Sequence, residues 1–412
     1  MRVLWFTNCI LSDAESSGSG SWLFAMRDLL CDKVSLYNVC LGEKGLDRIE
    51  KNNIKEYVIQ KKIAENHERL LCSLNKIVDE IKPDIIHVWG TESVWASVVY
   101  KLNCDCKRIL EIQGLLTACY NAYWAGLTPD EIKSCRTLMG TIVPKLSLSY
   151  NYKQLSKKAQ SEKELIEKYD LISTQSDWTR CQLWAYNKKR NRQFFQTLRP
   201  IRRVFYESCL WRPHQRKEIV LFTSLSYCVP FKGLHVLLKA LKVLVDHTPN
   251  VKLKIAGVNI SGGRFFTDGY TIYLQKLVKE LALTNQIEFV GRLTAGQLVE
   301  HLLDADLFIN PSFVESFSAS SVEAFSIGTP SLLAYSGAMP GFSDPVKIAE
   351  YYNPLDYHDA AAKAWNLIMD KERAEALSEK ASSHIRELCS PFSVCNRQLE
   401  IYSISAKDSN EK

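Results

Sequence analysis

The fold is decided by the stretch EIVLFTSLSYCVPFKGLHVLLKALKVLVDHTPNVKLKIAG, residues 218–257. Residues 218–225 form a short apolar run that is typical of a buried strand. The apolar residues of 232–247 then recur with helical spacing, and 252–257 is a second short apolar run. A strand, a helix and a strand in this order predict a βαβ unit, whose two strands lie parallel in one sheet.

The same alternation continues along the chain and predicts an α/β protein. The other expected strands are residues 3–7, 108–114, 169–176, 287–293, 306–312 and 330–335. Residues 82–90 are interpreted as a helix end, a turn and a buried strand that finishes at His87–Gly90. A helical, polar segment at 115–168 is expected to decorate one face of the first domain. The basic stretch 187–217 lies between the two halves and is interpreted as a hinge region.

The length of 412 residues favours two domains over one core. The predicted fold class is therefore α/β, with two Rossmann-like, doubly wound domains that face a cleft. We expect the first domain at 1–200 and the second at 201–385. Residues 386–412 are expected to form a C-terminal helix that packs back toward the first domain, and a polar tail. Ligands of such domains bind at the carboxyl ends of the strands.

Composition excludes several classes of protein. Hydrophobic residues make up 46% and charged residues 24%, which is typical of a globular protein and excludes a largely disordered one. The net charge of +6 is too mild to indicate nucleic-acid binding, but it suits an acidic small molecule or an anionic membrane surface. No signal peptide or membrane-spanning run is evident, and the thirteen cysteines are scattered without a CxxC pair. Free thiols in a reducing cytoplasm are expected, with no metal site.

The stretch PSFVESFSASSVEAFSIGTP, Pro311–Pro330, places two glutamates among small residues directly after an expected strand. Ser320 and Glu323 have the spacing of a capping box, which predicts a short helix from near Ser320 to Gly328. Glu323 is then either a helix cap or a ligand-binding group. Free N–H groups at the start of that helix favour an anion, and small side chains let a diphosphate approach the backbone.

Lys232–Gly233 follows the strand at 218–225. A lysine at such a loop can reach a phosphate as a compact charge, although a solvated turn lysine is an ordinary alternative. The presence of both motifs after strands of the same half favours the phosphate-binding interpretation. The basic run Lys188–Arg192, with Arg199, Arg202 and Arg203, is interpreted as a solvated face or as a contact with anionic headgroups.

Four segments together resemble the donor-binding domain of GT-B glycosyltransferases of family 4, the glycosyl transferases group 1. They are Lys232–Gly233, IAG at 255–257, FVGRL at 289–293, and Pro311–Pro330. That family carries a Glu-x7-Glu signature, whose spacing Glu315 and Glu323 match. The first half resembles a subgroup from bacterial capsule and surface-polysaccharide clusters in residues 110–127, 172–184 and 198–211. The resemblance covers nearly the whole chain.

The resemblance implies retaining sugar transfer from a nucleoside-diphosphate sugar, with no cofactor and no bound metal. Residues 1–200 would be the acceptor-side domain and 201–385 the donor-binding domain. Lys232 would neutralise the leaving diphosphate, and Glu315 would contact the sugar ring as positive charge develops on it. The implied donor-binding residues are Gly233, Gly257, Arg292, Leu293, Ser316, Phe317, Ser318, Ala319 and Glu323, the last of these contacting the ribose. The implied phosphate-loop and acceptor residues of the first half are Ser19, Gly20 and Gln113.

Two positions depart from the family pattern. Residues 220–232 lack the arginine that often precedes the lysine, which leaves its charge to Arg292, Arg264 or a first-half residue. Gln113 stands where many relatives have a histidine. It can hydrogen-bond a sugar hydroxyl but cannot take a proton, a task that the leaving phosphate can perform.

The sequence thus predicts a bacterial, cytoplasmic glycosyltransferase at the inner face of the cell membrane, in capsule, O-antigen or exopolysaccharide synthesis. Its expected partners are a nucleotide sugar, a saccharide acceptor that is lipid-linked, and an anionic membrane, but no nucleic acid. One alternative is a nucleotide-sugar epimerase or hydrolase of the same fold, which Gln113 disfavours. The other is a non-catalytic partner subunit, which the missing arginine favours.

Overall fold

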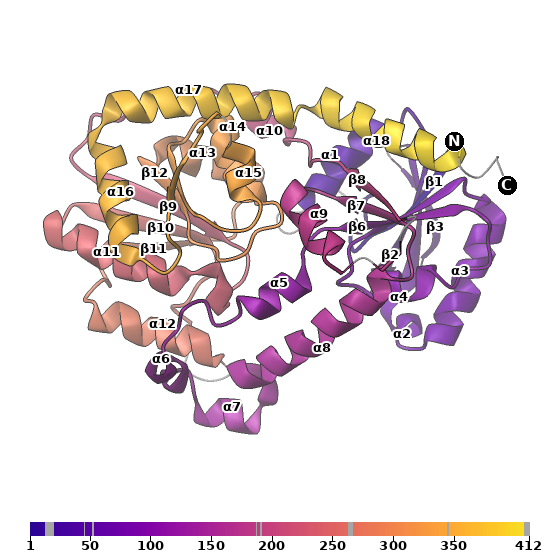
Figure 1. The fold of residues 1–412 in the computed structure, drawn as a ribbon, viewed down its shortest axis with the longest axis horizontal. Helices are drawn as coiled ribbons and strands as arrows, with labels where there is room; N and C mark the ends of the chain where they lie inside the picture. The colour runs from indigo at the N-terminus through magenta and orange to yellow at the C-terminus, as the bar shows by residue number, and fades with distance from the viewer. Residues whose placement is uncertain are drawn as a thin grey trace. The chain divides into compact units, whose positions relative to one another are not determined.

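A computed structural model describes residues 1–12, 20–44, 46–51, 53–186, 188–189, 192–262, 267–343 and 346–407. The chain forms two compact units (Figure 1). The first unit consists of Met1–Leu115, Gln160–Arg202 and Cys389–Lys412, and the second consists of Leu116–Ala159 and Arg203–Leu388. Each unit is built on one sheet with helices packed around it, so each has the α/β architecture that the strand–helix alternation predicts.

The first sheet has, within the described residues, eight strands in the order β3-β4-β2-β1-β5-β6-β7-β8. All neighbours are parallel except β3 and β4. The strands are β1 (Arg2–Phe6), β2 (Ser35–Gly42), β3 (Leu46–Lys51), β4 (Ile54–Gln60), β5 (Ile85–Trp89), β6 (Lys107–Ile112), β7 (Leu171–Thr174) and β8 (Gln193–Gln196). The sequence did not predict β2, β3 or β4. The expected hinge at 187–217 is partly wrong, because β8 lies inside it and belongs to the sheet.

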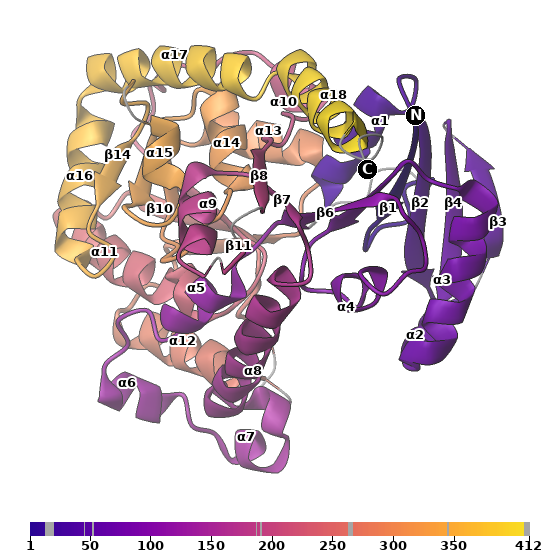
Figure 2. The ribbon, with the colours of Figure 1, turned by 45° about the vertical axis from the view of Figure 1, so that its right-hand side comes forward.

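The helices of the first unit cover this sheet. They are α1 (Ser21–Leu30), α2 (Lys61–Ala64), α3 (His67–Ile81), α4 (Trp95–Val99), α9 (Asp177–Trp184), α18 (Pro391–Lys407) and the second part of α8 (Leu148–Ile166). Figures 1 and 2 show α18 beside α1. The Tyr402 hydroxyl on α18 accepts a hydrogen bond from Trp5 Nε1 at 2.9 Å and lies 2.9 Å from His87 Nδ1. His87 is fully buried, and its burial lowers its pKa.

The second sheet has, in the described residues, six parallel strands in the order β11-β10-β9-β12-β13-β14. They are β9 (Ile219–Leu225), β10 (Val251–Gly257), β11 (Ile287–Gly291), β12 (Leu307–Asn310), β13 (Ser331–Ala334) and β14 (Glu350–Tyr352). Numbered from β9, this is the order 3-2-1-4-5-6 of a Rossmann domain. The predicted fold class of two Rossmann-like α/β domains is confirmed.

The helices of the second unit come from two parts of the chain. Arg203–Leu388 supplies α10 (Arg203–Tyr206), α11 (Leu234–His247), α12 (Gly269–Glu280), α13 (Ala295–Asp304), α14 (Ala319–Ile327), α15 (Met339–Ser343), α16 (Tyr357–Met369) and α17 (Lys371–Leu388). Leu116–Ala159 supplies α5 (Leu116–Asn121), α6 (Pro129–Ser134), α7 (Leu138–Ile142) and the start of α8.

The location of Leu116–Ala159 corrects a prediction, because this segment was expected on the first domain. Non-local contacts fix it in the second unit. Glu131 Oε1 accepts hydrogen bonds from Lys239 Nζ at 2.6 Å and from the Tyr273 hydroxyl at 2.7 Å. His235 is buried on α11, with Nε2 at 3.0 Å from the carbonyl oxygen of Ala125. Burial lowers the pKa of His235 to about 4, so the ring is neutral. Its Nε2–H donates to the Ala125 carbonyl oxygen, and Nδ1 accepts from the Tyr270 hydroxyl at 2.9 Å.

Candidate active site

The candidate site lies where the order of the second sheet reverses. From β9 the chain continues to β10 on one side, and from β12 it continues to β13 on the other. β9 and β12 are neighbouring strands, and ligands of such sheets bind outside the carboxyl ends of the strands at this reversal, the topological switch point. Lys232 follows β9 in the short turn Pro230–Lys232, and Glu315 follows β12. The two residues that the sequence proposed as catalytic thus share this switch point.

Lys232 and Glu315 form an ion pair, with 2.6 Å between Nζ and Oε1. Their side chains are 20% and 13% exposed, so both reach solvent from partly buried positions. A charged pair at this depth interacts more strongly than a pair on the open surface. Without a ligand, each side chain neutralises the other. A diphosphate beside Lys232 would compete with Glu315 for the same ammonium group.

The loops that carry these two residues are joined through their backbones. Gly233 has φ = 73°, and a Cβ at this position would lie 1.9 Å from the carbonyl oxygen of Pro311. The N–H of Phe313 donates to the carbonyl oxygen of Phe231 at 2.8 Å. A glycine is therefore required after Lys232, because only a residue without a side chain permits the close approach of the loop that carries Glu315.

Helix α14 begins at Ala319, and its N-cap is Ser318. Ser318 Oγ accepts from the N–H of Ser321 at 3.3 Å, and Asn310 Nδ2 donates to the hydroxyls of Ser318 and Ser321 at 3.0 and 2.9 Å. The predicted capping box of Ser320 and Glu323 is wrong, because the cap lies two residues earlier. At such a start the N–H groups of the first turn have no acceptor within the helix, and the positive end of the helix dipole favours an anion.

Glu323 lies in the second turn of α14, partly buried and beyond the capping position. Helix capping therefore does not account for this glutamate.

The remaining donor-side candidates gather at the same edge of the second sheet. Gly257 ends β10 with φ = 87°, and a Cβ there would lie 2.2 Å from the carbonyl oxygen of Leu225. Arg292, which is exposed, and Leu293 follow β11. Ser316 and Phe317 are buried in the loop before α14, whose first residue is Ala319. Because parallel strands end at one edge, the residues after β9, β10, β11 and β12 are neighbours in the order of the sheet.

The first-half candidates belong to the first unit. Gly20 precedes α1 with φ = 96°, and a Cβ there would meet Cys9 Sγ at 2.7 Å. Gln113 follows β6 and is partly buried. Ser19 and Arg264 lie outside the described residues. The roles of Gly20 and Gln113 stay predictions.

Glu92 is a carboxylate beside Gln113 that the sequence reasoning missed. A Cβ on Gly90 would lie 2.3 Å from Glu92 Oε2, and one on Gly114 would lie 3.1 Å from Oε1. The carboxyl group reaches solvent, but the protein around it desolvates it and raises its pKa, while Arg199 acts in the opposite direction. The signal in the sequence is the run WGTE, where an acid follows a buried strand that ends in glycine.

Ser336 and Gly337, in the turn after β13, were also missed. Ser336 Oγ donates to the carbonyl oxygen of Ser312 at 2.6 Å, and the N–H of Ala338 donates to that of Glu315 at 2.8 Å. Gly337 has φ = 58°, and a Cβ there would lie 2.2 Å from the carbonyl oxygen of Glu315. This turn therefore packs directly against the backbone of Glu315.

Replacing Gly337 with alanine is expected to displace Glu315. The new methyl group must push against the backbone of Glu315, and positive φ adds strain, so unfolding should become easier by about 1–3 kcal/mol. Gly296→Ala on α13 is the matched control, because a Cβ there meets nothing within 4 Å. Thermal denaturation and nucleoside-diphosphate titration of both variants test this. Identical behaviour of the two variants would contradict the proposed close contact.

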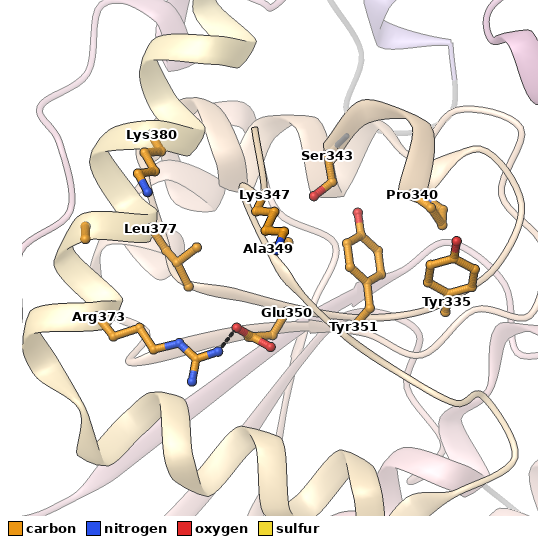
Figure 3. A pocket seen from close by; sticks show the side chains of 11 residues that line it. Tyr335, Pro340, Ser343, Lys347, Ala349, Glu350, Tyr351, Arg373, Leu377 and Lys380 are labelled. Carbon is orange, nitrogen blue, oxygen red and sulfur yellow. Dashed lines mark hydrogen bonds and ion pairs between the residues drawn. The ribbon is translucent and has the colours of Figure 1, made fainter. Parts of the chain in front are cut away.

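A cavity of about 560 Å³ lies elsewhere in the second unit (Figure 3). It is lined by residues of α15, β14 and α17, with Tyr335 after β13. Arg373 and Glu350 form an ion pair across it. None of the predicted site residues is among its lining residues, so this cavity is separate from the Lys232–Glu315 site.

Most cations of the basic run at the domain connection that the structure describes are paired or buried, Lys188 is exposed, and Arg190 lies outside the described residues. Lys189 pairs with Asp170 at 2.8 Å, and Arg203 pairs with Glu207 at 2.7 Å. Arg192 is buried against Glu167 and backbone carbonyls, Arg199 donates to Gln175 and stacks on Trp22, and Arg202 is buried. The interpretation of this run as a headgroup contact stays a prediction.

The described part of the chain offers neither a metal site nor a membrane-spanning helix. Within it, no group of three or more His, Cys, Asp and Glu side chains is arranged to hold a metal ion. In the same residues, no helix has both the length and the apolar character needed to cross a membrane.

The segment that carries Lys232 and Glu315 matches a known protein family. Residues 212–384 match the glycosyl transferases group 1. The matched segment contains Lys232, Glu315 and Glu323, so the family resemblance predicted from these motifs is confirmed. The group 1 segment lies entirely within the second unit.

A relative and two solved structures extend the comparison. A D-inositol 3-phosphate glycosyltransferase of Corynebacterium jeikeium is 32% identical over 157 residues, which are 37% of this chain and 36% of that protein. The chain thus spans little more than a third of that curated relative's length. The fold is similar to that of a sucrose-phosphate synthase from Thermosynechococcus elongatus, with a TM-score of 0.75 and 14% identity over 97% of this chain and 98% of that one. It is also similar to Anabaena HepE in complex with UDP, with a TM-score of 0.67 and 14% identity over 98% and 100% of the chains.

Proposed function

We propose that this protein is a retaining glycosyltransferase that moves a sugar from a nucleoside-diphosphate sugar to a saccharide acceptor. The observation that carries the proposal is the pairing of Lys232 with Glu315 at the switch point of the Rossmann-like second unit, within the group 1 segment. A lysine that a diphosphate can reach, a helix start and a carboxylate at one sheet edge suit a ligand that joins a diphosphate to a sugar.

Each group has a task in this reaction. The bond between the anomeric carbon and the diphosphate oxygen breaks, and the electron pair leaves with the diphosphate. Lys232 and the N–H groups at the start of α14 stabilise that negative charge, and the carboxylate of Glu315 stabilises the positive charge on the sugar. The acceptor oxygen bonds to the anomeric carbon on the same face, and its proton passes to the leaving phosphate. No protein base is needed, which is compatible with Gln113.

The acceptor is proposed to be a lipid-linked saccharide of bacterial surface polysaccharide synthesis, and the protein to act at the cytoplasmic face of the membrane. The resemblance of residues 110–127, 172–184 and 198–211 to the capsule subgroup supports this class. The name of the Corynebacterium relative, a D-inositol 3-phosphate glycosyltransferase, makes inositol 3-phosphate a second candidate acceptor.

Radiolabelled nucleotide sugars, offered with lipid extract, with inositol 3-phosphate or with neither, test the proposal. Label transferred to lipid supports the lipid-linked acceptor, and label on the phosphorylated polyol supports the second candidate. Turnover without any acceptor would instead favour an epimerase or hydrolase. Nucleotide binding without turnover in every arm would favour a non-catalytic partner subunit.

Activity is expected to be independent of divalent metal ions. Lys232 and the start of α14 already supply positive charge where the diphosphate leaves. The initial rate should therefore be equal, within error, with and without a chelator. Loss of activity on chelation and its recovery with manganese would contradict this.

A further inference from the structure

Residues 132–159, in the second unit, form a positively charged segment without acids. Its cations are Lys133, Arg136, Lys145, Lys153, Lys157 and Lys158. The preceding acid, Glu131, is neutralised by Lys239, and Asp130 is exposed at the start of α6.

The same segment exposes two large apolar side chains. Leu138 is 79% exposed and Ile142 is 66% exposed, both on the short helix α7. Residues four apart lie on the same face of a helix, so these two side chains form one small apolar patch. In the sequence, Lys133 and Arg136 precede this apolar patch and Lys145 follows it. All three side chains are exposed. Figures 1 and 2 show α7 at the edge of its unit, farther from the sheet than α12.

Hydrogen bonds fix this segment on both sides of α7. A loosely held loop is therefore not the reason why Leu138 and Ile142 are exposed. On the side before α7, Thr128 and Glu131 form a capping box, and Glu131 binds Lys239 and Tyr273. Burial alone would raise the pKa of Glu131, but the hydrogen bonds from Lys239, the Thr128 N–H and Tyr273 bring it to about 2. On the side after α7, the Tyr123 hydroxyl donates to the carbonyl oxygen of Leu148 at 3.2 Å.

We propose that α7 and its flanking cations form a docking surface for an anionic lipid bilayer. A bilayer with anionic headgroups offers negative charge at its surface and hydrocarbon just beneath, which matches cations around an exposed apolar pair. An apolar groove on a partner protein would cover Leu138 and Ile142, but it would not neutralise the cations around them. A water-soluble polyanion would satisfy only the cations.

Docking at α7 would hold the unit that carries Lys232 and Glu315 at the membrane. This surface differs from the basic run at the domain connection, whose cations are largely paired. Because bilayer binding requires no sugar chemistry, the inference stands or falls independently of the proposed transferase activity.

Sedimentation with lipid vesicles tests the surface in the full-length protein. One set of vesicles contains equal parts of phosphatidylglycerol and phosphatidylcholine, and the other contains phosphatidylcholine alone. The unaltered protein should bind the first set and not the second, and added salt should weaken binding. Leu138→Ser with Ile142→Ser should reduce binding at least about tenfold. Replacing Lys133, Arg136 and Lys145 with glutamine should reduce it on the order of a hundredfold, at about fivefold per charge.

Matched controls are Met369→Ser, an exposed apolar side chain elsewhere in the second unit, and glutamine at the exposed Lys217, Lys252 and Lys380. Both controls should bind vesicles like the unaltered protein, and all variants should keep their melting temperature and nucleotide affinity. Equal binding to the two vesicle sets, no binding at all, or unchanged binding of the α7 variants would overturn the proposal. If the Leu138 and Ile142 variant instead dissociates an oligomer in sedimentation analysis, with vesicle binding unaltered, α7 is an interface between copies. Vesicle binding without sugar transfer would remove only the proposed function.

Discussion

Replacing Lys232 with alanine is expected to weaken nucleoside-diphosphate binding and lower turnover by roughly ten- to a hundredfold. A charge-assisted contact to phosphate is usually worth about 1.5–3 kcal/mol, which corresponds to that range. The structure adds a second cause. With its ion-pair partner gone, the partly buried carboxylate of Glu315 is left unpaired close to the approaching diphosphate. Isothermal titration with nucleoside diphosphate and steady-state kinetics measure both effects.

Lys242→Ala is the matched control for this variant. Lys242 lies on α11, the helix that follows the loop of Lys232. Its side chain forms an ion pair with Asp246, one turn further along the same helix. Its removal should leave binding and turnover unchanged, because a surface pair of this kind contributes little. If correctly folded Lys232→Ala binds and turns over like Lys242→Ala, Lys232 has no part in the site.

The central strands of the second unit, β9, β12 and β13, were predictable because almost all of their residues are buried. Such strands appear in the sequence as continuous apolar runs, and each is followed by a helix with clear periodicity. The run at 218–225 corresponds to β9 and the run at 252–257 to β10 within a residue at each end. Lys232 and Glu315 were found for the same reason, because each stands shortly after such a run.

The missed strands of the first unit carry polar side chains in its core. Asn38 on β2 donates to Glu56 on β4 at 2.6 Å, and both are fully buried. Glu56 also accepts from the backbone N–H groups of Leu11 and Ser12. Each polar residue is satisfied only by a distant segment, so in the sequence they interrupt the apolar pattern that marks a strand. β8 is a run of four residues beside a basic stretch, which is too short to stand out.

The details of the site that were missed depend on contacts between distant residues. Several serines near α14 are possible caps by spacing, and Asn310 selects Ser318 by binding its hydroxyl. Gly337 meets Glu315 only once β13 has paired with β12. The segment Leu116–Ala159 joins the second unit through Glu131, whose partners Lys239 and Tyr273 lie more than one hundred residues away. Local spacing contains no information about such partners.

Replacing each of the two glutamates of the family signature with glutamine is expected to change a different kinetic property. Glu315→Gln should lower the turnover number by about a hundred- to a thousandfold, because its charge matters most as the anomeric carbon becomes positive. Donor affinity should not fall, because the diphosphate no longer competes with a carboxylate for Lys232. Glu323→Gln should weaken donor affinity by about tenfold at nearly constant turnover, because a ribose contact exists equally in the ground and transition states. Donor titration and steady-state kinetics on both variants separate the two effects.

The observed N-cap of α14 removes one explanation for the effect of Glu323→Gln that the sequence left open. If Glu323 completed a capping box, glutamine would replace it silently, because glutamine also completes such a box. Ser318 is the cap and Glu323 lies in the second turn, so a silent Glu323→Gln would instead mean that no donor group touches it. Glu300→Gln, an exposed glutamate on α13, is the control for loss of a carboxylate. Small effects from both signature variants, equal to this control, would show that neither glutamate contacts the donor. The site would then have to lie away from the switch point of the second sheet.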